Sequence, residues 1–421
     1  MRFIADFHIH SKYSRATSPQ MDLENLDKWA KIKGIKVLGT GDFTHPEWFK
    51  NLKEKLEPAE TGLFRLKIKD SRFKNNATRF ILTTEISCIY SKKNKVRKIH
   101  IIIFAPSFEV VEKINTHLGW IGNLKADGRP ILGLDAKELV KIVLGISEDC
   151  LIIPAHAWTP YFGIFGSKTG FDSIEECFED YSKYIYSIET GLSSSPDMNW
   201  RLSPLDKITL ISNSDAHSPQ KIGREANVFD TELSYPAIIE AIKSKDPKKF
   251  LYTIEFFPQE GKYHYDGHRI CGISCPPSQT KKYNGICPVC GRPLTIGVLN
   301  RVEELADREE GFKPENAIPF KSLIPLGELI AEAVGVGVGT KEVEREYKNL
   351  IEKFGSEFNV LLETPIFDLK SETLPEIAEG IIRMREGKVY IEPGYDGVYG
   401  KIKVFSPAEE KSSSRKQNTL F

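Results

Sequence analysis

The chain has 421 residues, which is long enough for two or three domains with a large buried core. Lys plus Arg equals Asp plus Glu, at 58 each, so the whole-chain charge does not indicate a nucleic-acid or membrane partner. No apolar run approaches the roughly 18 residues of a membrane span. The N-terminus also lacks the order of a signal peptide, and we therefore expect an intracellular, cytoplasmic protein.

The chain begins with an apolar strand that runs directly into two histidines, in the sequence MRFIADFHIH. Residues i and i+2 face the same side of a strand, so the imidazoles of His8 and His10 can point at one spot. A metal ion is the obvious ligand for that pair. For an H-x-H pair alone, however, two incidental histidines are the more common explanation, so the rest of the chain must decide.

From Arg2 to about Phe257, short β-rich runs alternate with amphipathic segments. Strand followed by helix, repeated, predicts parallel strands joined by helical crossovers. Polar residues cluster just after the apolar runs, at the C-terminal ends of the predicted strands. This pattern favours an α/β barrel with its active site on that rim over a doubly wound sheet.

Histidines and carboxylates gather at these strand ends, where six of the nine histidines lie. The candidate metal ligands are His8, His10, Asp42, His45, Glu85, His100, His156, Asp215 and His217. Each has an ordinary explanation alone, but chance would also scatter histidines over helices and loops. Imidazoles with bridging carboxylates suit Zn, Mn or Fe, and so many ligands imply two or three ions. Neighbouring metals that hold a phosphate oxygen and activate a water indicate phosphoester hydrolysis.

The order of these motifs resembles the polymerase and histidinol phosphatase (PHP) superfamily over residues 1–257. The resemblance implies a distorted (β/α)7 barrel with a trinuclear metal site. Glu85 would bridge two metals, and Asp215 would help to hold the ion bound by His8 and His10. These four residues would be the catalytic ones.

The same resemblance implies that His100 and His156 complete the second ion. The sequence departs from the superfamily pattern after the second strand, where Asp42 is followed by Phe-Thr-His rather than directly by His. No histidine follows the first pair closely either. His45 and His217 are then the expected ligands of a third ion.

Four of the seven cysteines lie within twenty residues, which argues against a disulfide framework and for a metal site. Cys271 and Cys275 form one pair, and Cys287 and Cys290 form the second. Two thiolate pairs at this spacing predict a structural zinc site with four thiolates, in a zinc-binding module over residues 258–296.

The same module is rich in basic and aromatic residues suited to a phosphate backbone. We expect DNA contacts from Arg269, Lys281 and Lys282, although zinc ribbons also bind proteins.

Residues 297–405 are predicted to be a helical DNA-binding region. A Gly-rich turn at 335–339 separates two helical patterns, which resembles a helix-hairpin-helix that offers backbone amides to a DNA phosphate. Periodicity alone predicts only a helical hairpin.

Residues 406–421 are polar, and we predict that they form a disordered tail. In this tail, Gln417, Leu420 and Phe421 resemble the start of a peptide that binds the sliding clamp PCNA. The sequence stops before the aromatic pair that completes such a peptide.

A PHP barrel followed by a four-cysteine module and a hairpin-bearing helical region resembles the endonuclease Q family along the entire chain. The resemblance implies a DNA repair endonuclease that nicks single- or double-stranded DNA 5′ to uracil, hypoxanthine, xanthine or an abasic site. It also implies zinc in the thiolate site and in the catalytic cluster, with Mg or Mn supporting activity.

A lesion nuclease must extract a nucleotide from the base stack, which requires a pocket. The predicted pocket residues are Trp158, Tyr161, Phe162, Phe165, Lys168, Ser193 and Ser195. Aromatics at this density are also typical of a core. Two other functions fit the sequence: a small-molecule phosphatase acting on histidinol phosphate or nucleotides, and a non-catalytic DNA- or clamp-binding scaffold.

Overall fold

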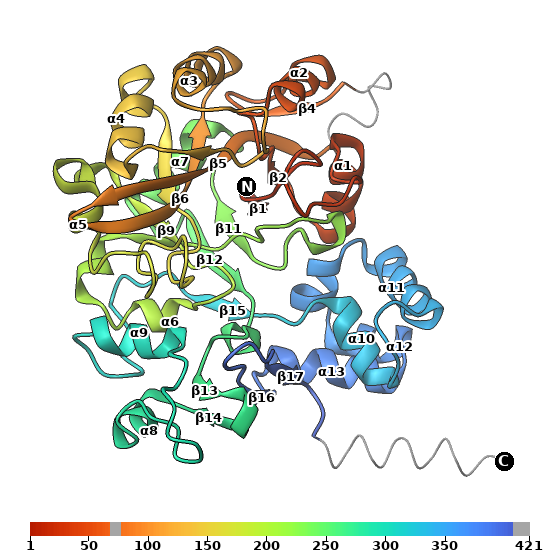
Figure 1. Cartoon of the computed structure of the whole chain (residues 1–421). Helices are drawn as coiled ribbons and strands as arrows, with labels where there is room; N and C mark the ends of the chain where they lie inside the picture. Colours follow the sequence, from red (N-terminus) through yellow and green to blue (C-terminus); the bar gives the residue numbers. More distant parts are fainter. Residues whose placement is uncertain (68–76, 407–421) are drawn as a thin grey trace, which may run out of the picture. The chain divides into compact units, whose positions relative to one another are not determined.

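The structure is a computed structural model that describes residues 1–67 and 77–406 (Figure 1). The chain forms two units. The first consists of Met1–Lys31, Ile35–Glu255 and Val298–Lys321. The second consists of Ile32–Gly34, Phe256–Gly297 and the chain from Ser322 onward.

The first unit is built on an 11-stranded sheet and a small two-stranded one. The strands of the large sheet are β1 (Arg2–Asp6), β2 (Val37–Gly39), β3 (Leu56–Pro58), β4 (Phe64–Leu66), β5 (Arg79–Lys92), β6 (Lys95–Ala105), β7 (Ile131–Leu132), β8 (Leu151–Pro154), β11 (Ala226–Asp230), β12 (Phe250–Glu255) and β15 (Phe320–Ser322). The small sheet pairs β9 (Ser187–Glu189) with β10 (Thr209–Ile211) in parallel.

Seven of these strands follow one another around a ring. β1 pairs in parallel with β2, and β2 in parallel with β5. The long strand β5 then pairs antiparallel with β6, and β6 antiparallel with β8. The joins on either side of the small sheet are looser: Ala157 donates to the carbonyl of Glu189, and Ile9 forms a bridge with Ala216. The predicted α/β class is confirmed. The described strands do not close into one hydrogen-bonded barrel, because β9 and β10 form a separate sheet that meets the large one at these two joins.

Helices cover the outside of the ring. They are α1 (Leu23–Lys33), α2 (Pro46–Lys55), α3 (Phe108–Ile121), α4 (Ala136–Ile146), α5 (Ile174–Phe178), α6 (Pro196–Asn199), α7 (Tyr235–Ser244) and α9 (Val298–Leu305). Ser107 and Asp135 begin α3 and α4 by accepting hydrogen bonds from backbone amides of the first turn. Inside the ring, Phe7 packs edge-on against Phe104, with ring centroids 5.3 Å apart.

The second unit contains the four cysteines and most of the C-terminal helices. Its elements are β13 (Asp266–His268), β14 (Ile273–Cys275), α8 (Pro277–Lys282), α10 (Leu326–Val334), α11 (Lys341–Phe354), α12 (Ile366–Glu372), α13 (Pro375–Arg385), β16 (Tyr390–Glu392) and β17 (Lys401–Lys403). The helices α10 to α13 pack together as one group (Figure 1).

The predicted helical hairpin is present between α10 and α11. Gly335 ends α10 in the left-handed conformation at φ 71°, which glycine adopts without steric cost. Thr340 begins α11, since its side chain accepts a hydrogen bond from the amide of Val343. A DNA-binding role for this hairpin stays a prediction.

One helix from the predicted C-terminal region belongs to the first unit. This helix, α9, is tied there by Arg301, whose guanidinium donates to the carbonyls of Phe165 and Phe171 at 3.2 Å each. The four-part functional division at residues 257, 296 and 405 stays a prediction.

Across residues 1–67 and 77–406, the structure has no helix with the length and apolar character that a membrane crossing requires. The predicted clamp-binding residues Gln417, Leu420 and Phe421 lie outside the described residues.

Candidate metal centre and substrate cavity

The strands of the ring bring functional side chains to one region, most of them from the C-terminal ends of strands and two, Glu85 and His100, from the middle of a strand. His8 and His10 follow β1, His156 follows β8, and Asp215 follows β10. Glu85 lies within β5, as described next. The C-terminal ends of parallel strands meet at one edge, which explains why residues so far apart in sequence converge.

The pairing of β5 with β6 sets the position of Glu85 relative to His100. Ser87 is directly opposite His100 in this antiparallel ladder. Glu85 is two residues before Ser87 and therefore faces the same side of the sheet, diagonal to His100. The Nδ1 atom of His100 lies 2.7 Å from Oε1 of Glu85.

The first group of ligand atoms comes from His8, His10, Glu85 and Asp215, all within 4.8 Å of one another. Nε2 of His10 lies 3.1 Å from Oδ1 of Asp215 and 3.2 Å from Oε2 of Glu85. Nε2 of His8 lies 3.5 Å from the same Glu85 oxygen. Four donors of this kind are a ligand set that a divalent cation accepts.

The second group joins Glu85, His100 and His156. Nε2 of His156 lies 3.0 Å from Oε1 of Glu85 and 3.2 Å from Nδ1 of His100. Glu85 thus turns one oxygen to each group, which is the geometry of a carboxylate that bridges two ions.

The chemistry of the ligand atoms fits metal ions. Nε2 of His8, Nε2 of His10 and Oδ1 of Asp215 are buried polar atoms that make no hydrogen bond. Unpartnered buried polar atoms are costly in an apoprotein, and a bound cation would satisfy all three.

The ligands of the centre differ in protonation. Burial lowers the pKa of His100 to about 4, which leaves its imidazole neutral at pH 7. Burial opposes ionisation of Glu85, but His100 and the Arg129 guanidinium outweigh it and hold the pKa of that carboxyl well below its usual range. At neutral pH the site therefore presents the neutral imidazole of His100 and the ionised carboxylate of Glu85. Burial opposes protonation of His8 and His10, but Glu189 and Asp42 outweigh it and raise the pKa of both imidazoles well above the ordinary value, so a cation bound there must displace their protons.

Two further carboxylates orient the histidines from behind. Both oxygens of Glu189 lie within 3.1 Å of Nδ1 of His8, and Oδ1 of Asp42 lies 3.0 Å from Nδ1 of His10. Carboxylates in this position fix the orientation of a metal-binding imidazole and raise its basicity.

Asp42 was predicted to be a ligand, and the structure places it behind His10 instead. Its second oxygen accepts from the amide and hydroxyl of Ser11, at 2.6 and 2.7 Å, so neither oxygen is directed at the ligand groups. Glu189 was missed by the sequence analysis, although its place at the end of β9 matches the strand-end pattern that located the others.

Three residues of the centre hold left-handed backbone conformations that favour glycine. The φ angles are 51° at Asp42, 46° at Asp215 and 29° at His156. Such backbone strain concentrates at functional sites, where the surrounding structure holds it in place.

The predicted third set of ligands does not come together in the described chain. The His217 ring lies beside that of His10, with centroids 4.5 Å apart, and its Nδ1 is 2.9 Å from the carbonyl oxygen of Asp215. The His45 ring stacks on Tyr13. Neither joins the two groups of ligand atoms found among residues 1–67 and 77–406.

A cavity of about 420 Å³ opens beside the second ligand group. Its lining consists of Arg15, Ser87, His100, Asp127, Arg129, Ile131, His156, Thr159, Tyr161, Phe162, Gly191, Leu192, Ser193 and Asp215. Of the predicted pocket residues, Tyr161, Phe162 and Ser193 are in this lining.

The other predicted pocket residues do not line it. Trp158 and Phe165 are buried and pack on each other, and the indole of Trp158 donates to Asn199. The Ser195 hydroxyl is buried and hydrogen-bonded to Asp197, and Lys168 is exposed. These two aromatics are therefore core residues, as their density in the sequence also allowed.

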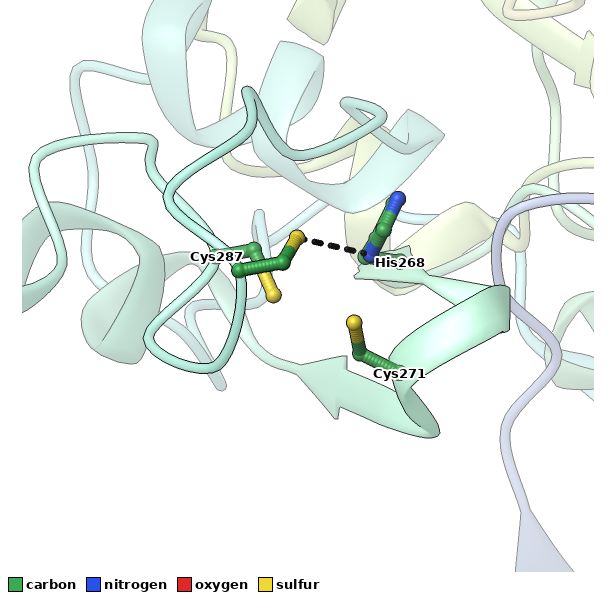
Figure 2. Close-up of side chains that lie close together, drawn as sticks. His268, Cys271 and Cys287 are labelled. Atoms are coloured by element: carbon green, nitrogen blue, oxygen red, sulfur yellow. Dashed lines mark hydrogen bonds between the residues drawn. The ribbon is translucent and has the colours of Figure 1, made fainter.

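The cysteine cluster differs from the predicted one in one member. Cys271, Cys287 and Cys290 group with His268, and their ligand atoms lie within 4.8 Å of one another. Figure 2 shows His268, Cys271 and Cys287 facing a common space, and Nδ1 of His268 lies 3.5 Å from Sγ of Cys290. Cys275 is buried beside Cys287, and its Sγ lies 3.4 Å from the Thr280 hydroxyl. Sequence spacing identified the thiols and gave no sign of His268.

The predicted DNA-binding residues of the zinc module are on the surface of the second unit. Arg269 is exposed, and its amide donates to Asp396 at 2.7 Å. Lys281 and Lys282 are exposed in the last turn of α8. Their contact with DNA stays a prediction.

Comparison with known proteins finds one family model and two curated proteins to which this chain is similar. Residues 325–388 match the family model of the MJ0043 C-terminal domain. Protein MJ0043 of Methanocaldococcus jannaschii is 37% identical over 59% of this chain and 31% of its own length, so the alignment spans about a third of that protein. Protein YqxK of Bacillus subtilis is 29% identical over 96% of this chain and 99% of its own.

Two solved structures match almost the whole chain. The lesion-specific endonuclease PfuEndoQ of Pyrococcus furiosus has a TM-score of 0.85 and 31% identity, over 98% of this chain and 99% of that one. Endonuclease Q in complex with a 27-mer duplex, with an abasic lesion at the active site, has a TM-score of 0.83 and 32% identity, over 97% and 98%. On the strength of this identity over nearly the full length of both chains, the chain belongs to the endonuclease Q family.

Proposed function

We propose that this chain is a metal-dependent DNA repair endonuclease. Its reaction is hydrolysis of the phosphodiester 5′ to a deaminated base (uracil, hypoxanthine or xanthine) or to an abasic site. The observation that carries the proposal is Glu85, whose two oxygens face two separate groups of ligand atoms. The family relationship supports the substrate, because a relative of 32% identity was crystallised with a duplex bearing an abasic lesion.

The ligand groups fit a pair of divalent cations. His8, His10, Glu85 and Asp215 would hold one ion, and Glu85, His100 and His156 would hold the other. We infer zinc in this cluster, because imidazole nitrogens dominate the ligand set, with Mg or Mn able to support activity. When bound, such ions polarise a phosphate oxygen and lower the pKa of a bound water.

The residues of the chain keep this centre in a reactive state. Glu189 and Asp42 hold the two imidazoles of the first group in one orientation, so the ligand atoms need no rearrangement when an ion binds. Glu85 stays ionised, and His100 stays neutral at pH 7.

The adjoining cavity is suited to an extruded nucleotide. Its volume of about 420 Å³ falls within the range of small-ligand sites, which is about 300–1,000 Å³. Tyr161 and Phe162 supply aromatic faces on which a base can stack, and Ser193 supplies a hydroxyl that can meet a base edge. We propose that a damaged nucleotide enters this cavity with its 5′ phosphate at the ligand groups.

The remaining parts of the chain fit accessory roles in the same reaction. We propose that the cysteine cluster holds a structural zinc ion and that Arg269, Lys281 and Lys282 contact the DNA backbone. The C-terminal residues Gln417, Leu420 and Phe421 are proposed to bind the sliding clamp PCNA. Such a substrate would place the enzyme with the chromosome, in the cytoplasm.

The proposal is tested by assaying the purified protein on three substrates. The enzyme is incubated with Mn²⁺ or Mg²⁺ and either a duplex with a single uracil, the matched undamaged duplex, or a small phosphomonoester. We expect a single nick 5′ to the uracil and no product from the other two. Turnover of the phosphomonoester alone would identify a phosphatase, and DNA binding without any product would identify a scaffold.

A further inference from the structure

A short turn at residues 127–129 is built into the metal centre, although sequence reasoning gave it no role. A Cβ atom on Gly128 would lie 2.3 Å from Oδ2 of Asp42 and 2.3 Å from Oγ of Ser14, so only glycine fits there. The Gly128 amide also donates to the carbonyl of Tyr13 at 3.1 Å. The turn is therefore fixed against the carboxylate that orients His10.

Asp127 uses this fixed turn to hold two arginines. Its Oδ1 accepts from the backbone amides of Arg15 and Arg129, at 3.3 and 3.2 Å. Its Oδ2 accepts from Nε of Arg15 at 3.2 Å. Both arginine side chains line the 420 Å³ cavity, together with Asp215 and His156.

Arg129 reaches the bridging carboxylate itself. Its Nη1 donates to Oε2 of Glu85 at 3.0 Å, and 27% of its side chain remains exposed toward the cavity. A guanidinium has five donors, so one contact with Glu85 leaves donors for a second anion. Oε2 of Glu85 also lies 3.2 Å from Nε2 of His10, which makes it part of the first ligand group.

Once metal ions are bound, the guanidinium of Arg129 needs a second anion to balance its charge. Two divalent ions on Glu85 would repel the guanidinium and weaken its attraction to that carboxylate. A substrate phosphate at the ligand groups is the anion that replaces it, and planar guanidinium matches phosphate oxygens with two parallel hydrogen bonds.

We propose that Arg129 is a catalytic residue that binds a non-bridging oxygen of the scissile phosphate, and that Arg15 binds a neighbouring phosphate of the same strand. The inference rests on the proposed function and adds to it the contact that positions the phosphate. Arg15 suits the outer position because 74% of its side chain is exposed and Asp127 holds it at the rim.

The test removes the side chain of Arg129 and, independently, the negative charge of the scissile phosphate. Binding is measured in the Asp215→Asn background, with a uracil duplex that has either a normal or an uncharged methylphosphonate linkage at the scissile position. We expect Arg129→Ala to weaken binding of the normal duplex about tenfold, the worth of one charge-assisted pair, and to leave methylphosphonate binding unchanged. Arg15→Ala should weaken both duplexes alike, because its phosphate is charged in both.

The conservative variant and a matched control complete the test. Arg129→Lys keeps the charge but loses the paired hydrogen bonds, so it should retain part of the difference between the two duplexes. Arg65 is a partly buried arginine with one carboxylate partner, Glu57, and does not line the cavity, so Arg65→Ala should change neither affinity.

Two results would overturn the inference. If Arg129→Ala weakens both duplexes equally, or lowers the metal content measured by elemental analysis, Arg129 only positions Glu85. If Arg129→Ala changes neither affinity, it does not touch the phosphate. The proposed function is judged apart from these outcomes, by whether the unmodified enzyme nicks the uracil duplex.

Discussion

The imidazole and carboxylate centre of the first unit and the thiol cluster of the second are organised in opposite ways. In the first, His8, His10 and Glu85 are almost fully buried, and Glu189 and Asp42 hold the histidines in place. In the second, Cys290 is exposed, and the small core around the thiols contains Cys275, Cys287 and Leu294. The fold thus builds the first site before any metal arrives, whereas the second site depends on its metal for order.

The comparison predicts that the two sites fail differently, and the largest effect should come from Asp215→Asn. The change removes a ligand charge and leaves the side-chain volume, so nicking of a uracil duplex should fall by at least about 10³-fold. The melting temperature should hardly move, because the fold supports the centre independently of this ligand. Nicking assays beside thermal melts check both, and nicking at the original rate would contradict the metal mechanism.

Disruption of the thiol cluster should mainly lower the thermal stability of the protein. Changing Cys287 and Cys290 together to Ser removes two zinc ligands, and the melting temperature should fall by about 5–10 °C as the metal-dependent order is lost. Zinc content should drop by one ion per chain, and DNA affinity should fall with it. As a control, Cys150→Ser alters a buried thiol of the first unit that belongs to neither site. If only catalysis fell in the double variant, the cluster would not be structural.

Glu189→Gln should have an intermediate effect, confined to the first site. The amide cannot match the charge that Glu189 presents to Nδ1 of His8, so metal affinity of the first group should fall by about 10–100-fold. Metal titration of the apoprotein measures this loss. Asp42→Asn is the matched variant behind His10 and should behave alike. An unchanged affinity in both variants would show that the orienting carboxylates have no influence on the metal.

The same contrast explains which parts of the molecule the sequence could predict. Although Glu85 and His100 lie in the middle of β5 and β6, the strand pattern identified His8, His10, Glu85, His100, His156 and Asp215, because most of these residues follow strands whose C-terminal ends meet at one edge. It could not separate a ligand such as Asp215 from an orienting residue such as Asp42, since that depends on which way a side chain turns. Arg129 had no signal at all: it lies in a loop, and its role follows from the contact with Glu85. His268 was missed for a related reason. The spacing of the cysteines does not reveal that a histidine on the strand β13 lies beside three of them.

The pH response offers the smallest test, because it separates a group in the second unit from the metal chemistry of the first. His264 is buried, and burial lowers its pKa to about 4, below the ordinary value of 6.5. The folded state therefore prefers the neutral ring.

Stability from this group is fully present above pH 6.5 and is lost as the pH falls from 6.5 toward 4, because the unfolded chain takes up the proton first. A shift of this size corresponds to roughly 3 kcal/mol. His264→Phe should flatten the pH dependence of the second unit's melting over that window, whereas exposed His117 changed in the same way should leave it as it was. An unaltered pH dependence in the His264 variant would mean that the ring is charged or solvated in the folded state.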